Sequence, residues 1–154
     1  MSKAKQATAA KIDAYFTGCL YFSISKLQRH INKLAEAAFS DVGLAPGQIF
    51  LLMALHEEKN CSASHLSEML GLAPSTITRF IDKLEKQGLC TRKLEGRVSH
   101  TSITAKGRRL MPDIQAGWKT LFQSYSEIFG EEDAKALNKM IVSFNNTAPN
   151  RNLR

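Results

Sequence analysis

The strongest constraint on the fold is a four-residue junction, Gly71-Leu72-Ala73-Pro74, which separates two short amphipathic segments. Glycine tolerates the left-handed backbone that closes many helices, and proline is favoured at the first position of the next helix, where its missing N–H costs nothing. Apolar residues on both sides recur at helical spacing, so we expect helices over about 63–70 and 74–87. A mostly buried helix over about 46–58 and a polar break over 59–62 should precede them.

Beyond the second of these helices, the hydrophobic period changes from helical to alternating. The segments 89–93 and 99–103 are β-like, and Gly96 between them marks a turn, so the sequence predicts a small β-hairpin with Arg97 at its tip. Two helices, a tight turn and a hairpin with a basic tip, in this order, are typical of a winged helix-turn-helix. We expect this lobe to span about 46–104.

Long amphipathic segments flank the lobe. Helical periodicity predicts one uninterrupted helix over about 11–39. After the hairpin, Thr104 can cap a helix that runs to about Phe129, in which Pro112 and Gly117 could introduce bends. A last helix is expected from Glu131 to about 147.

The chain of 154 residues suits one domain, residues 1–154, in which the segments 11–39 and 105–147 surround the lobe. The fold class that we expect is mainly α with a small β-hairpin wing. A polar lead-in over residues 1–10 and a disordered tail from Thr147 are predicted at the ends.

The charge is concentrated in one part of the chain. The formal net charge is +7, and residues 71–110 hold nine basic and three acidic residues, so +6 of it lies in this segment. Localised positive charge is what a phosphate backbone requires, and we therefore expect double-stranded DNA as a partner. The chain has no apolar run long enough for a membrane helix, and we expect no secretory signal. Its three scattered cysteines suit the reducing cytoplasm.

In a helix-turn-helix, the second helix enters the major groove and its first residues meet base edges. Here the outward positions of that helix carry short hydroxyls, an arginine and a lysine, while the hairpin carries basic residues suited to a minor groove. The first helix of the motif adds candidate contacts to the DNA backbone. The predicted DNA-binding set is Ser64, His65, Ser75, Thr76, Thr78, Arg79, Lys83, Arg92, Lys93 and Arg97.

Residues 62–107 resemble the multiple-antibiotic-resistance-regulator (MarR) family of bacterial transcription factors. The resemblance rests on the stretch Ser64 to Arg79, on Leu84-Glu85-Lys86-Gln87-Gly88-Leu89, and on Ile103-Thr104-Ala105-Lys106-Gly107 after a short hairpin. It departs from the family pattern at two places. Ala73 stands where the family has a capping hydroxyl, and the wing is about three residues short, with Glu95 in place of an aspartate before Arg97.

The resemblance implies N- and C-terminal dimerisation helices, a homodimer on a pseudo-palindromic operator, and a repressor more often than an activator. It also implies a small anionic or phenolic ligand that could release the DNA. A redox-switched variant would sense peroxide through Cys19, which otherwise is expected to be a buried core residue. A third possibility is a winged-helix protein-interaction module that does not bind DNA.

Catalysis, cofactors and metals find no support in the sequence. It contains no Gly-rich phosphate loop, nucleophile elbow or metalloprotease helix, so we expect no enzyme and no cofactor. The four histidines, His30, His56, His65 and His100, are scattered, without a paired spacing or a Cys–His cluster, and no metal site is predicted. His30 and His56 remain candidates for the lining of a ligand pocket.

Overall fold

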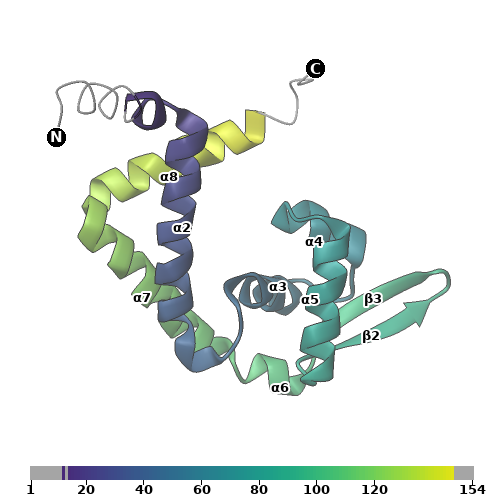
Figure 1. Ribbon diagram of the computed structural model, residues 1–154. Helices are drawn as coiled ribbons and strands as arrows, with labels where there is room; N and C mark the ends of the chain where they lie inside the picture. Colours follow the sequence, from purple (N-terminus) through teal and green to yellow (C-terminus); the bar gives the residue numbers. More distant parts are fainter. Residues whose placement is uncertain (1–11, 13, 148–154) are drawn as a thin grey trace.

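The computed structural model describes residue 12 and residues 14–147 of the chain, so the expectations for residues 1–10 and for the tail beyond Thr147 lie outside the described residues. The elements are α2 (Leu20–Ala38), η1 (Ser40–Val42), α3 (Pro46–Glu57), β1 (Cys61–Ser62), α4 (Ala63–Leu70), α5 (Pro74–Lys86), β2 (Cys90–Glu95), β3 (Val98–Ile103), α6 (Ala105–Arg108), α7 (Met111–Phe129) and α8 (Glu131–Thr147). Figure 1 shows α3, α4, α5 and the sheet as a lobe, from which α2, α7 and α8 extend as arms. The expected class, mainly α with a small wing, is confirmed.

The helix-turn-helix forms as predicted, because local signals start and stop both of its helices. Ser62 caps α4 by accepting the backbone N–H of His65 at 3.2 Å. Gly71 then adopts φ 61°, and the Ser67 hydroxyl donates to the carbonyl of Leu72 at 2.5 Å to fix the turn. At the start of α5, Ala73 supplies no side-chain cap, and Pro74 begins the helix.

The hairpin is longer and its turn tighter than the sequence predicts. β2 and β3 pair antiparallel from Cys90 opposite Ile103 to Glu95 opposite Val98. Only Gly96, with φ 64°, and Arg97 remain for the turn. The predicted loop at 94–98 is thus mostly strand, because a two-residue turn with a left-handed glycine suits the twist of paired strands.

The polar break expected at 59–62 is wrong in part, since Cys61 and Ser62 form the strand β1. β1 pairs with β3, Cys61 opposite Thr101, and gives a three-stranded sheet of order β1-β3-β2. Two residues are too few for an alternating pattern, so this strand exists through its partner alone. Asn60, with φ 58°, makes the bend before it and accepts a hydrogen bond from Ser102 at 2.6 Å.

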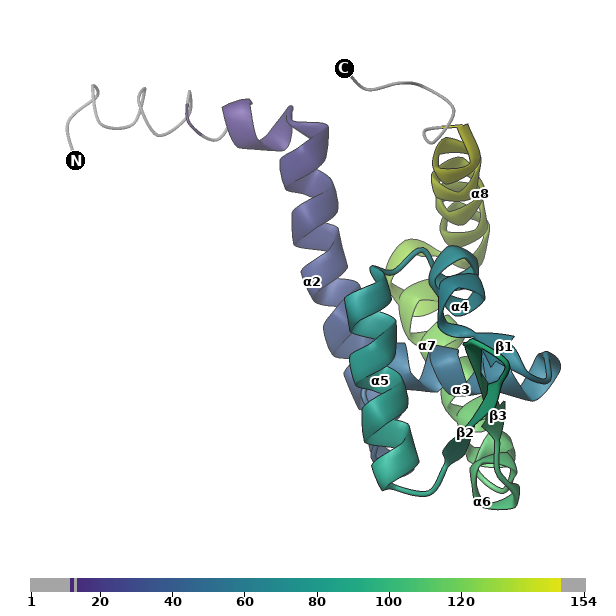
Figure 2. The same cartoon turned by 90° about the vertical axis from the view of Figure 1, so that its right-hand side faces the viewer.

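The single helix predicted over 11–39 is also wrong. Residues 14–17 are helical, but Gly18 forms a turn and Cys19 is extended, so α2 starts only at Leu20. Glycine in a helix costs about 1 kcal/mol relative to alanine, which explains the position of the break. In Figure 2 the short N-terminal turn of helix lies at an angle to α2.

The helix predicted from Thr104 to Phe129 divides into α6 and α7. Thr104 caps α6 as expected, accepting the N–H of Gly107 at 3.1 Å. Pro112 lies in the first turn of α7, where a proline is tolerated, and a helix cannot run through it without losing a hydrogen bond. Gly117 does not interrupt α7, and it lies buried in this helix against Phe39.

The core lies mainly in the lobe and centres on α3. This helix buries residues around most of its circumference, as the sequence predicts, and lies behind α5 in Figure 2. Most of the largest fully buried side chains come from four helices, α3, α4, α5 and α7, and from the residue after α2, and they are Phe39, Ile49, Leu51, Leu52, Leu55, Leu66, Ile77, Ile81, Leu84 and Ile114. The lobe is therefore a rigid platform for the surface of α5.

Candidate nucleic-acid interface

The outer face of α5 presents the residues that were predicted to enter a groove. Its inner face buries Ile77, Ile81 and Leu84 in the core. On the other side Ser75, Thr78, Arg79 and Lys83 are exposed and Thr76 is half-buried. Figure 2 shows α5 along the open side of the lobe, accessible over its length.

Two side-chain contacts order the first turns of α5. The Thr78 hydroxyl donates to the carbonyl of Pro74 at 3.0 Å, and Nη2 of Arg79 donates to Oγ1 of Thr76 at 3.4 Å. An arginine, with five N–H donors, keeps others for a base edge or a phosphate. The arrangement gives short hydroxyls and one long cation on a single helical face.

The wing carries its basic residues outward. Arg97 occupies the two-residue turn at the tip, and Lys93 lies on β2 opposite His100. Both side chains are exposed. Figure 1 shows the hairpin projecting from the lobe next to the C-terminal end of α5, so the wing and α5 border the same side of the molecule.

Arg92 is engaged within the protein instead of pointing freely outward. Its Nε donates to Oε2 of Glu85 at 2.9 Å, its Nη2 pairs with the carboxylate of Asp82, and its backbone N–H donates to Oε1 of Glu85 at 2.9 Å. These hydrogen bonds raise the pKa of Arg92 above its usual value, and the one with Asp82 contributes most. Arg92 therefore ties the wing to α5.

This clamp is the feature that sequence reasoning missed. Asp82 and Glu85 are three residues apart on α5, and hence on one helical face, with an arginine on the next strand. That spacing was the available signal.

The two candidate residues on α4 differ in their surroundings. Ser64 and His65 are both exposed in the first turn of the helix. His65 is hydrogen-bonded through Nε2 to Oε2 of Glu58 at 2.6 Å. Cys61 lies beside this pair, and the ligand atoms of Glu58, Cys61 and His65 all fall within 4.8 Å of one another. The expectation that the chain has no Cys–His cluster is therefore wrong.

The three cysteines are free thiols in different environments. Cys19 is exposed at the helix break, which contradicts its expected burial in a core stripe. Cys61 and Cys90 are buried. Burial, with a smaller contribution from Glu85, raises the pKa of Cys90 to about 11, and burial with Glu58 raises the pKa of Cys61. At neutral pH, Cys90 is thus a protonated and unreactive thiol.

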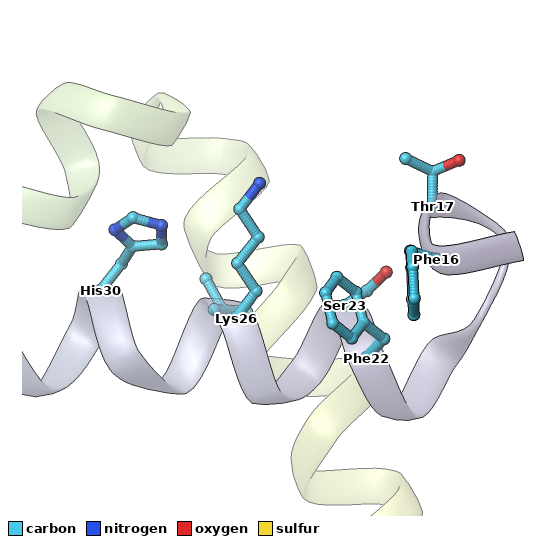
Figure 3. Close-up of a pocket in the computed structure, with 7 residues that line it drawn as sticks. Phe16, Thr17, Phe22, Ser23, Lys26 and His30 are labelled. Carbon is cyan, nitrogen blue, oxygen red and sulfur yellow. The ribbon is translucent and has the colours of Figure 1, made fainter. Parts of the chain in front are cut away.

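Cavities lie on the arms and beside the sheet. One of about 350 Å³ is lined by Phe16, Phe22, Lys26 and His30 among others, with the two phenyl centroids 4.7 Å apart. Figure 3 shows Lys26 and His30 projecting from the same side of α2. A second, of about 560 Å³, includes His56, so both histidines that were named as pocket candidates line a cavity.

A third cavity, of about 400 Å³, lies between α2, α7 and α8. Its lining includes the aromatic residues of α7, which are Trp118, Phe122, Tyr125 and Phe129. Within the described part of the chain, no helix is long and apolar enough to cross a membrane.

Comparisons with known proteins agree on one family. A family model described as the MarR family matches residues 44–94. The chain is 29% identical over 117 residues to the HTH-type transcriptional repressor MdtR of Bacillus subtilis strain 168, covering 74% of this chain and 76% of that protein.

Solved structures show the same fold. The transcriptional repressor CouR bound to p-coumaroyl-CoA is similar with a TM-score of 0.77 at 21% identity, covering 84% of this chain and 94% of that one. CouR bound to a 23-mer DNA duplex is similar with a TM-score of 0.73 at 20% identity, with the same coverages, 84% and 94%.

Proposed function

We propose that this chain, which belongs to the MarR family of transcriptional regulators, represses transcription by binding a pseudo-palindromic operator in double-stranded DNA as a homodimer. The observation that carries the proposal is the outer face of α5. Ser75, Thr78 and Arg79 are exposed there, on a helix whose opposite face is anchored in the core. A rigid helix with a polar face is what base readout in the major groove requires.

The remaining candidate residues have roles that follow from their positions. Lys83 lies further along α5 and would contact phosphates, and Lys93 and Arg97 on the wing would contact the backbone or the minor groove. Ser64 and His65 on α4 would contact the backbone of the DNA. Arg92, through its pairs with α5, is assigned the positioning of the wing.

A homodimer is supported by apolar side chains that the arms leave exposed. On α2, Leu20 is 68% and Tyr21 81% exposed, and on α8, Met140 is 63% and Phe144 64% exposed. Surfaces of this kind on several neighbouring elements are typical of protein interfaces. A two-fold pairing through the arms would place two copies of α5 on successive turns of the duplex, about 34–36 Å apart.

A small anionic or phenolic effector is the further part of the proposal. The cavity that contains Lys26 and His30 offers basic groups beside two phenyl rings, which suits an aromatic anion. The similar structures support ligand control in related folds, since CouR was solved with p-coumaroyl-CoA as well as with DNA. Binding next to α2 would act on the arms, and through them on the spacing of the two recognition helices.

The redox-switched alternative gains one observation, because Cys19 is exposed at the break before α2. Mild peroxide treatment followed by mass spectrometry tests it. Modification of Cys19 together with loss of DNA binding would support this switch. An unmodified Cys19 with unchanged DNA binding would exclude it.

The test of the proposed function is the selection of bound sequences from a random duplex library at about 0.15 M salt, where non-specific binding is weak. We expect an enriched inverted repeat with half-sites one helical turn apart. If the folded dimer enriches no sequence, and still enriches none after effector candidates are added, the result would contradict DNA-binding repression. It would favour the third possibility, a winged-helix module that binds an acidic protein surface.

A further inference from the structure

We propose that Glu58, Cys61 and His65 form a binding site for a divalent transition metal, with zinc as the preferred ion. The three residues come from the end of α3, from β1 and from the first turn of α4. Oε2 of Glu58 lies 2.6 Å from Nε2 of His65 and 4.0 Å from Sγ of Cys61. A carboxylate, an imidazole and a thiol thus converge on one point.

The donor set and its spacing fit zinc. Zinc takes sulfur, nitrogen and oxygen ligands together, whereas magnesium and calcium prefer oxygen alone. In a tetrahedral zinc site, neighbouring ligand atoms lie about 3.3–3.6 Å apart. Small side-chain rotations of Glu58 and His65, both exposed, would open their 2.6 Å contact to that spacing. Three protein ligands leave a fourth position for water.

The backbone around the site is held independently of any ion. Cys61 is fixed in the sheet opposite Thr101, and the Ser62 hydroxyl caps α4 one turn below His65. The Cys61 thiol donates to the carbonyl of Glu58 at 3.5 Å, so the sulfur already faces the end of α3. The ligands are therefore arranged before the metal arrives, which reduces the entropic cost of binding.

Binding has a defined chemical balance. The Cys61 thiol loses its proton to solvent, a Zn–S bond forms, and no electron is transferred. The ion would link the C-terminal end of α3 to the N-terminal end of α4. Because the folded state alone offers this geometry, metal binding should raise the thermal stability of the protein.

The test is a titration of the full chain with cobalt(II), a spectroscopic substitute for zinc, in the absence of DNA. We expect one cobalt per chain, with a thiolate-to-cobalt charge-transfer band and the visible bands of a tetrahedral site, all displaced by zinc. Cys61→Ser should abolish the charge-transfer band. Glu58→Gln and His65→Gln should weaken cobalt binding at least about tenfold.

The chain supplies a matched control for each variant. Cys19→Ser, Glu57→Gln and His56→Gln change exposed residues of the same types outside the trio, and they should leave the cobalt spectrum intact. Zinc should raise the melting temperature of the wild type and not that of His65→Gln. A wild type without the thiolate band, or a band that survives Cys61→Ser, would overturn the site. If Cys61→Ser fails to fold, the exposed Glu58 and His65 variants decide.

Discussion

At the scale of single residues, close contacts limit which substitutions the fold can accept. Gly117 shows this most clearly. A Cβ atom added to it would lie 2.5 Å from Cδ1 of Phe39 and 2.8 Å from the carbonyl oxygen of Ala38. The ring of Phe39 is fully buried and the oxygen belongs to the end of α2, so neither can move freely. α7 therefore crosses the end of α2 at a distance that only glycine permits.

Gly117→Ala should lower the free energy of unfolding by about 1–3 kcal/mol, because overpacking outweighs the better helix propensity of alanine. Urea unfolding at a fixed protein concentration, followed by the fluorescence of Trp118, measures this free energy of unfolding. Gln115→Ala, an exposed change on the same helix, should stay within about 0.5 kcal/mol of the wild type. A stabilised Gly117→Ala protein would show that α2 and α7 are not packed this closely.

Arg97→Ala should weaken operator binding by about 1–3 kcal/mol, the usual scale for a lost groove contact. Arg97 lies in a two-residue turn and is exposed, so the change should leave the fold intact. Fluorescence anisotropy with the selected operator measures the affinity. Lys119→Ala removes another exposed charge, on α7, and serves as the control. Unchanged affinity of the Arg97 variant would remove this residue from the interface.

At the scale of elements, the recognition helix and the wing act as one body. The guanidinium of Arg92 bridges Asp82 and Glu85, so the base of β2 keeps a fixed position relative to α5. Each exposed ion pair is worth only about 0.2–1 kcal/mol of stability. Its main effect is geometric, since the distance between two DNA-reading elements must match the distance between two grooves.

Arg92→Lys should weaken operator binding nearly as much as Arg92→Ala does, although lysine keeps the positive charge. A lysine cannot donate to both carboxylates in the planar geometry of arginine, so the clamp is lost in both variants. Binding isotherms on operator and on random duplex separate this effect from simple loss of charge. Full retention of affinity in Arg92→Lys would indicate that Arg92 contacts phosphate and does not position the wing.

Elements with local signals were predictable from the sequence, and elements that depend on distant partners were not. Gly71 and Pro74 fix the turn between α4 and α5 without help from the rest of the chain. The strand β1 exists because it pairs with β3. Thr101, the partner of Cys61 in this pair, lies forty residues further along the chain. The candidate groove residues on α5 follow from helical periodicity, whereas the Arg92 clamp required knowledge of which side β2 packs against.

At the scale of the whole molecule, the lobe and the arms divide the burial of apolar residues unequally. The lobe encloses most of the core, while α2 and α8 leave large apolar side chains such as Tyr21 and Phe144 exposed. Figure 1 shows these two helices extending away from the lobe. A second copy of the chain would cover this surface and set the spacing of the two lobes, which no single lobe can determine.

Phe144→Asp should raise the dissociation constant of the dimer at least about tenfold, because a carboxylate in a packed interface loses its hydration. Phe144 is 64% exposed in the single chain, so the lobe should remain folded. Sedimentation velocity over a range of concentrations measures the change, and operator affinity should fall with it. Gln115→Asp is the control. A Phe144→Asp protein that stays dimeric at every concentration would place the interface elsewhere.

The order of the three strands has a consequence for self-association. With β3 in the centre, β2 is an edge strand. Its outer edge has unpaired N–H and C=O groups that could pair with a strand of another molecule. Glu85 occupies one of these groups by accepting the backbone N–H of Arg92, and Arg92, Lys93 and Glu95 line the strand with charge. The side chains that hold the wing in place thus also hinder the pairing of β2 with the β2 of another molecule. A protein with an open sheet edge can therefore avoid aggregation at high concentration.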